Sequence, residues 1–264
     1  MLLGPWFYAY TVVFQGEAPG WLWFLAPIAM IGGWGPSVAA LLVARRTEGR
    51  SAVRRLLGSL GAWRVPGHWY VLVFLLPPLA TATSLLIVDR GPAMLGQFDP
   101  GAALANIPIA YAIALPFGPL GEELGWRGFA LPRLLARFEP WIATVILGAI
   151  WTLWHGPMML LMPGASMPSF MTPSVGSLLI YLIQITAETA FITLVFLRTN
   201  GSVLLAVLAH LTFNTAESVV FGGLPASSVE RLRAVYLVNV AVLALLGLVS
   251  LLLVSRHGER PSAA

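Results

Sequence analysis

Long apolar stretches separated by short polar connections dominate this sequence. A helix needs about 20 apolar residues to cross a bilayer core, and seven stretches approach or exceed that length: residues 21–44, 68–88, 101–120, 140–162, 176–197, 201–220 and 233–255. Only 10% of the residues are charged, whereas soluble domains carry about 25%, so a water-surrounded globule is excluded. The sequence therefore predicts a single all-α domain over residues 1–264, a polytopic transmembrane helical bundle of seven to eight spans. The eighth span depends on whether residues 1–14, which are apolar but short, also cross.

The basic residues are distributed unevenly between the expected loops. All fifteen are Arg, and six of them follow the first apolar stretch: Arg45, Arg46, Arg50, Arg54, Arg55 and Arg64. Cytoplasmic loops carry the excess of Lys and Arg. Threading the chain onward puts eleven Arg on that side and three on the other, with Arg127 left aside as a site residue. We therefore predict an integral protein of a bacterial-type plasma membrane with a cytoplasmic C-terminus. The net charge of +4 then reflects topology, and nucleic acid is not expected as a partner.

Few ionisable side chains interrupt this apolar background, and each is a candidate functional residue because its insertion costs about 2.5–3.5 kcal/mol. They are Glu122, Glu123, Arg127, His155, Glu188 and His210. Residues equidistant from the turn between two antiparallel helices lie at the same depth. Glu122, His155, Glu188 and His210 lie on four successive expected helices. The midpoint of each neighbouring pair falls in an expected turn, at residues 138–140, 171–173 and 199–201. We therefore predict one polar cluster, against the alternative that each side chain only hydrogen-bonds a neighbouring helix.

The two adjacent acids are expected to have different roles. Glu123 and Arg127 are four residues apart with the acid first, which is the favourable order for an ion pair on one helix face. Glu122 points about 100° away from Glu123 on a helix and is left without that partner. If Pro119 begins a new helical segment, both acids lie in its first turn. We therefore predict that Glu123 and Arg127 hold the segment in place while Glu122 faces the site.

Two imidazoles and an amide complete the polar set. His210 and Asn214 are four residues apart and share one helix face, and His155 lies on a different helix. A carboxylate that can accept a proton, an imidazole that can orient water, and further hydrogen-bond donors suit attack of water on an acyl carbon. With no Cys in the chain, disulfides, thiolate nucleophiles and Cys-ligated metals are excluded.

Three motifs between residues 116 and 217 resemble those of the CPBP family of intramembrane proteases, which includes the CAAX prenyl endopeptidases and the ABI proteins linked to bacteriocin immunity. The family's Glu-Glu-x-x-x-Arg motif corresponds to Glu122, Glu123 and Arg127, its Phe-x-x-x-His motif to Trp151 and His155, and its His-x-x-x-Asn motif to His210 and Asn214. The second motif departs from the family pattern because Trp stands at the aromatic position.

This resemblance implies an intramembrane endopeptidase that hydrolyses CAAX-type or other membrane-associated peptides or proteins. It assigns water activation to Glu122 and His155, and stabilisation of the oxyanion to His210 and Asn214. The midpoints place Glu188 at the same depth. We expect it to contact and position these residues without touching the substrate.

Two alternatives remain open at this point. Glu122, His155 and His210 would form a zinc site with one open position, which makes a metalloprotease an alternative to hydrolysis by side chains alone. Membrane acids and histidines also serve proton relays, so a proton-coupled carrier, or an immunity factor that acts by binding, competes with the peptidase. Carriers often show related halves with paired broken helices, and none is apparent in this sequence.

Overall fold

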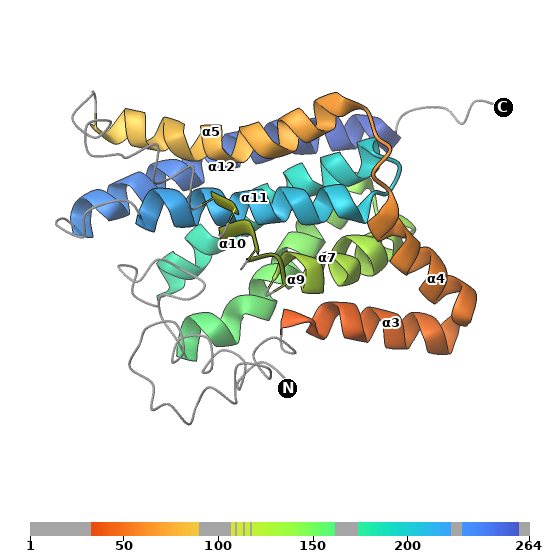
Figure 1. Cartoon of the computed structure of the whole chain (residues 1–264). Helices are drawn as coiled ribbons and strands as arrows, with labels where there is room; N and C mark the ends of the chain where they lie inside the picture. The colour runs from red at the N-terminus through yellow and green to blue at the C-terminus, as the bar shows by residue number, and fades with distance from the viewer. Residues whose placement is uncertain are drawn as a thin grey trace.

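The computed structural model describes residues 33–89, 107–222 and 229–258, apart from residues 109, 113, 117 and 162–173. Every regular element within these ranges is helical, which confirms the all-α prediction (Figure 1). The helices are α3 (Gly35–Thr47), α4 (Arg50–Gly58), η2 (Ser59–Gly61), α5 (Gly67–Asp89), α7 (Pro119–Gly125), η3 (Trp126–Ala130), α8 (Leu131–Leu135), α9 (Pro140–Leu161), α10 (Val175–Arg198), α11 (Val203–Gly222) and α12 (Val229–Gly258).

Five of the seven predicted apolar stretches correspond to one helix each, namely α5, α9, α10, α11 and α12. Among the described residues, three helices are long and apolar enough to cross a membrane: α5, α10 and α12. Residues 1–14, the first half of the stretch 21–44, and residues 101–106, 109, 113 and 117 of the stretch 101–120 lie outside the described residues. The fold is thus a helical membrane bundle, and its number of spans stays a prediction.

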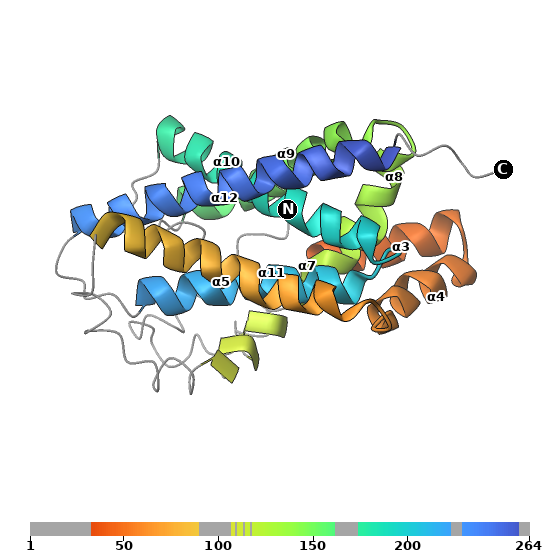
Figure 2. The same cartoon turned by 90° about the horizontal axis from the view of Figure 1, so that it is seen from above.

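Helix α10 lies at the centre of the bundle. It packs against α9, α11 and α12, and α5 packs against α11 and α12 (Figures 1 and 2). In α10, 67% of the most apolar window is buried, compared with 28% in α5 and 33% in α12. The outer faces of these two helices carry large apolar side chains suited to lipid, among them Leu75, Leu79, Leu245, Leu248 and Leu252.

Helix directions gather most of the Arg at one end of the bundle. Helices α5 and α9 begin at this end and α3, α10 and α12 finish there, on the right of Figure 1. The Arg residues of this end are Arg45, Arg46, Arg50, Arg54, Arg55, Arg64, Arg133, Arg137, Arg198 and Arg256. Of the other described Arg, Arg231 and Arg233 lie at the opposite end, at the start of α12. We refer to the first group as the Arg-rich end; its orientation toward the cytoplasm stays a prediction.

Close packing of α3 fixes the position of α7. A Cβ atom on Gly121 would lie 2.6 Å from the carbonyl oxygen of Gly33, and one on Gly125 would overlap Pro36. The Gly121 and Gly125 pair therefore lets two helices of the same chain approach closely, as small residues spaced by four do in membranes.

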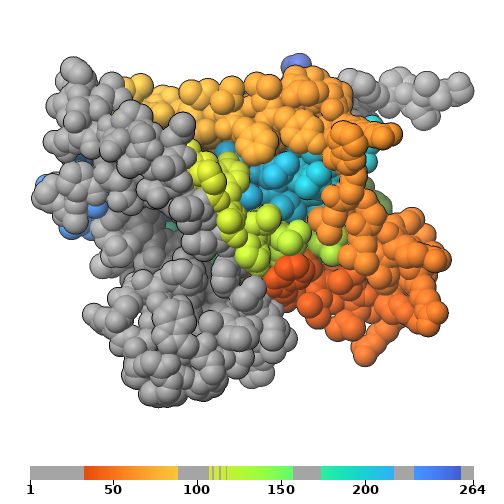
Figure 3. Space-filling model, viewed as in Figure 1, coloured from red at the N-terminus to blue at the C-terminus, as the bar shows by residue number. Residues whose placement is uncertain are grey.

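We refer to α7 and the following η3 as the α7 unit. The described residues between 107 and 116 join this unit to the rest of the bundle. In Figure 3 the segment lies at the surface between α5 and α3. The hydroxyl of Tyr111 donates to Thr212 Oγ1 on α11 at 3.0 Å, and the indole of Trp34, which precedes α3, donates to the carbonyl oxygen of Pro116 at 2.9 Å. These two hydrogen bonds connect the residues before α7 to α11 and to the start of α3.

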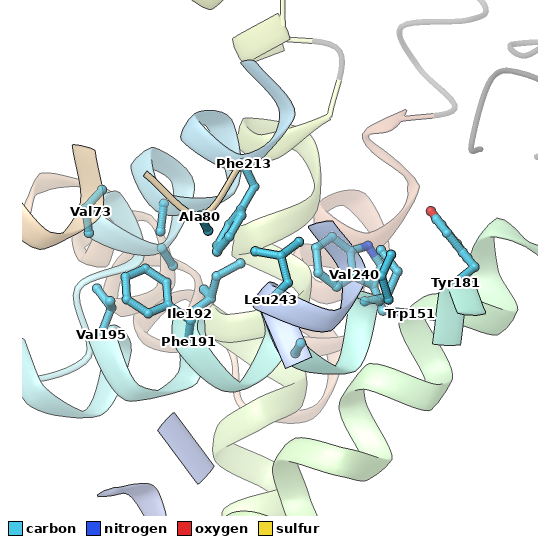
Figure 4. Packing of buried hydrophobic residues seen from close by; sticks show 14 of the residues in the cluster. Val73, Ala80, Trp151, Tyr181, Phe191, Ile192, Val195, Phe213, Val240 and Leu243 are labelled. Atoms are coloured by element: carbon cyan, nitrogen blue, oxygen red, sulfur yellow. The ribbon is translucent and has the colours of Figure 1, made fainter. Parts of the chain in front are cut away.

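Large apolar side chains from α5, α9, α10, α11 and α12 form one buried cluster (Figure 4). It includes Val73, Trp151, Phe191, Ile192, Val195, Phe213 and Leu243. Trp151 is 1% exposed, and it connects this cluster to the polar residues described next.

Candidate active site

The helix that carries the two adjacent acids is short and begins where the sequence predicts. Pro119 is its first residue, where a missing backbone N–H costs nothing. After Gly125 the backbone continues as a π-helical turn, Trp126–Ala130, before α8. Such turns occur often at functional sites, and nothing in the sequence analysis indicated this one. The turn carries Arg127.

Arg127 and Glu123 form the ion pair expected from their spacing. Arg127 Nη1 donates to Glu123 Oε1 at 2.6 Å, and both side chains are fully buried. The same carboxylate oxygen also contacts His210 Nδ1 at 2.8 Å, across 87 residues of sequence. Glu123 thus fixes the imidazole of His210 as well as the α7 segment. The predicted role of Glu123 as an anchor for its own helix was therefore incomplete.

Glu122 lies apart from this pair and is held by two indoles. Trp151 Nε1 donates to Glu122 Oε2 at 2.7 Å, and Trp126 Nε1 lies 3.4 Å from the same oxygen. The side chain is 4% exposed. A carboxylate accepts through both of its oxygens, and these two contacts engage Oε2.

The other carboxylate oxygen, Oε1, lies beside Gly118. A Cβ atom at Gly118 would lie 3.3 Å from Glu122 Oε1 and 3.9 Å from Asn214 Nδ2. An acceptor and a donor predicted from two separate motifs therefore flank the same glycine. Because Gly118 has no side chain, a small group can approach both atoms.

One ring nitrogen of His155 is engaged by the backbone. Its Nδ1 lies 2.9 Å from the carbonyl oxygen of Trp151, and because a carbonyl can only accept, Nδ1 carries the proton. Nε2 of the neutral ring then has a free lone pair. Glu122 and His210 are both near enough to His155 to interact with it electrostatically. The ring centroid lies 4.8 Å from Trp154 and 5.7 Å from Tyr181.

Trp151 is the centre of the arrangement. Its ring centroid lies 4.8 Å from that of His210 and 5.9 Å from that of His155, and the guanidinium carbon of Arg127 lies 4.6 Å above the ring. The sequence marked Trp151 only as a departure from Phe. A Phe could pack similarly, but it could not donate to Glu122. The motif alone did not indicate that the indole N–H of Trp151 lies within hydrogen-bond distance of Glu122.

Glu188 lies behind Arg127, with which it interacts electrostatically. Gln184 Nε2 donates to Glu188 Oε1 at 2.9 Å, and the hydroxyl of Tyr236 donates to Gln184 Oε1 at 2.7 Å. All three side chains are at least 95% buried. A polar chain thus runs from α12 through α10 to the α7 unit. Gln184 and Tyr236 were missed because neutral polar residues carry no distinctive signal in a membrane helix.

The predicted zinc ligands do not form a recognisable metal site. Among the residues that the structure describes, no three His, Cys, Asp or Glu side chains are grouped so that they could hold a metal ion. Nδ1 is engaged by Trp151 in His155 and by Glu123 in His210. Zinc at Glu122, His155 and His210 stays a prediction, and no chemical step below is routed through a metal.

Comparison with known proteins agrees with the three motifs. The family model described as type II CAAX prenyl endopeptidase Rce1-like matches residues 104–216. The chain is also 28% identical over 152 residues to the CAAX prenyl protease 2 of Methanococcus maripaludis, a match that covers 56% of this chain and 55% of that relative. The chain thus matches about half the length of this curated relative, and every residue of the candidate site from Gly118 to Asn214 lies inside the range matched by the family model.

Proposed function

We propose that the chain is an intramembrane endopeptidase acting on membrane-associated peptides, because residues 104–216 match the family model of the Rce1-like CAAX prenyl endopeptidases and the curated relative is a CAAX prenyl protease. The observation that carries the proposal is that Glu122 Oε1 and Asn214 Nδ2 both lie within 4 Å of the position that a Cβ atom of Gly118 would take. A CAAX-type prenylated tail is the first substrate class to test, because the family description and the curated relative both name it.

The proposed reaction begins with a water held between Glu122 Oε1 and Nε2 of His155. The water oxygen attacks the scissile carbonyl carbon while Glu122 takes one of its protons. The carbonyl oxygen becomes an oxyanion that accepts from Asn214 Nδ2. When the tetrahedral intermediate collapses, the carbon–nitrogen bond breaks and Glu122 passes its proton to the leaving amine.

His210 would be the second oxyanion donor. Its Nδ1 faces Glu123, so only Nε2 remains to meet the substrate. A neutral ring would present a lone pair there, and donation therefore requires the doubly protonated form. Glu123 would be the counter-charge of that form. Arg127 acts as a positioning residue because it contacts Glu123. Glu188, which interacts electrostatically with Arg127, and its hydrogen-bonded partners Gln184 and Tyr236 support Arg127 in this account.

Cleavage by the purified full chain tests the proposal. Proteoliposomes would be supplied with a farnesylated CAAX peptide, the same peptide without its prenyl group, and unrelated amphipathic peptides, with products identified by mass spectrometry. We expect cleavage of a membrane-associated peptide that is unaffected by a chelator. Loss of cleavage on chelation, restored by zinc, would contradict the metal-free chemistry. No cleavage of any peptide would contradict the proposed function.

Replacing Trp151 by Phe tests the indole that orients Glu122. The Phe ring keeps the packing, but it removes the 2.7 Å hydrogen bond to Glu122 Oε2. Hydrogen bonds to charged groups are worth about 1.5–3 kcal/mol, so kcat should fall roughly tenfold to a hundredfold with little change in KM. Trp126→Phe removes the longer contact of 3.4 Å and should cost less. A larger loss for Trp126→Phe than for Trp151→Phe would contradict this assignment.

Filling the space beside Gly118 should block the reaction without unfolding the protein. The Cβ of Gly118→Ala would lie 3.3 Å from Glu122 Oε1, where the attacking water or the scissile group must approach. We expect kcat/KM to fall by roughly tenfold to a hundredfold, as small misplacements at a reacting centre do. Gly156→Ala is the matched control, because a Cβ there meets nothing within 4 Å. Equal activities of the two variants would argue that the substrate binds elsewhere.

A further inference from the structure

A cavity with a partly charged lining lies at the Arg-rich end, apart from the candidate active site. It has a volume of about 180 Å³ and lies between α3, α4, the π-helical turn, α8 and the start of α11. Its charged lining consists of Glu48, Arg55 and Arg133. None of Glu122, His155, His210 and Asn214 lines it.

Two cations share one anion at the mouth of this cavity. Arg133 Nη2 pairs with Glu48 Oε1, and Arg55 Nη2 lies 3.7 Å from Glu48 Oε2. The lining therefore carries one net positive charge. The side chains of Glu48, Arg133 and Arg55 are 43%, 44% and 68% exposed. Exposed ion pairs contribute only about 0–1 kcal/mol, so an incoming anion can displace Glu48 from either guanidinium at little cost.

Beneath these charges the cavity wall is apolar. The apolar side chains of the lining are Ala44, Ala52, Leu56, Phe129, Phe196 and Val203, and Ser59 and two glycines complete it. Arg133 is held over the ring of Phe129 at 3.4 Å and donates from Nη1 to its carbonyl oxygen at 2.9 Å. This contact fixes the guanidinium between the apolar wall and the solvent. A free inorganic anion would gain nothing from such a wall, whereas an amphiphile would use both parts.

The elements around the cavity fit a position at the membrane surface. Helix α4 buries Ala52 and Leu56 against the bundle and exposes Arg50 and Arg54. Leu57 of the same helix and Trp63 beyond it are 47% and 59% exposed. Arg beside exposed Leu and Trp is typical of segments at the boundary between lipid and water, and basic pockets between helices at that boundary can bind anionic headgroups.

We propose that this cavity binds the phosphodiester headgroup of an anionic phospholipid. Arg55 and Arg133 donate to the phosphate oxygens, with Arg providing the planar pair of donors that phosphate accepts. The glycerol and upper acyl carbons lie against Leu56 and Phe129. One phosphodiester charge neutralises the net positive charge of the lining.

Lipid titration of the purified full chain in mild detergent tests this site. Short-chain phosphatidylglycerol would be compared with phosphatidylcholine of the same chain length, and bound lipid counted by native mass spectrometry. We expect one phosphatidylglycerol to bind more tightly than phosphatidylcholine. The double substitution Arg55→Gln with Arg133→Gln should weaken this binding by about tenfold or more, and Glu48→Gln should strengthen it severalfold.

A matched control separates the cavity from the general field of the Arg-rich end. Arg45→Gln with Arg46→Gln removes the same charge from the same end but from outside the cavity lining, and should change binding by no more than about twofold because exposed charges are screened by salt. Equal losses in the two double variants, or equal binding of the two lipids, would overturn the proposal. Displacement of phosphatidylglycerol by millimolar inorganic phosphate would identify a free-anion site and would also overturn it. If the Arg55 and Arg133 variant does not fold, unchanged binding by Glu48→Gln overturns the proposal on its own.

Discussion

Replacing Glu122 by Gln is expected to lower kcat for peptide cleavage by about 10²–10⁴-fold, the range that general-base catalysis contributes. Gln has nearly the same shape, and its amide oxygen can still accept from the indoles of Trp151 and Trp126. It cannot take a proton from water at neutral pH. Steady-state cleavage of the same peptide by the two proteins measures the effect, and their unfolding transitions should coincide.

The matched control for this substitution is Glu139→Gln. Glu139 is an exposed acid in the turn before α9, so its replacement changes the net charge equally without touching the candidate site. We expect it to retain full activity. Cleavage by the Glu122 variant at a similar rate would show that Glu122 does not activate the attacking water.

The second large effect is expected on stability. Arg127→Met leaves the carboxylate of Glu123 buried without its cation, although both side chains are fully buried in the native protein. Removing one partner of a buried ion pair costs about 3–5 kcal/mol, which unfolding in mixed detergent micelles would detect. Adding Glu123→Gln should recover part of this loss, because no unpaired charge then remains at that position.

The exposed Arg133 and Glu48 pair provides the comparison. Arg133→Gln should change the free energy of unfolding by no more than about 1 kcal/mol, as is usual for solvated ion pairs. If Arg127→Met were as well tolerated as Arg133→Gln, the buried pair would not be what holds the α7 unit in place. A double variant less stable than Arg127→Met alone would point to the same conclusion.

The sequence predicted the parts of this site that depend on spacing within one helix or on helix length. The ion pair of Glu123 and Arg127 follows from a separation of four residues, and the start of α7 follows from Pro119. Equal distances from the turns predict that Glu122, His155 and His210 lie at one depth, and the structure places all three around Trp151.

Contacts that depend on helix rotation could not be predicted in this way. Membrane helices that are apolar on all sides give little periodicity from which a facing direction can be derived. The contact between His210 and Glu123, and the indole donor from Trp151 to Glu122, depend on that rotation. No residue pattern in the sequence indicated the π-helical turn after Gly125.

The central claim is that Glu122 and His155 act together on one water molecule, and a double-mutant cycle in kcat/KM tests it most directly. Cleavage would be measured for the wild-type protein, Glu122→Gln, His155→Gln and the double variant. Residues that act as a unit show non-additive losses, so the double variant should be about as slow as the slower single variant. Losses that multiply independently would contradict a shared water between the two side chains.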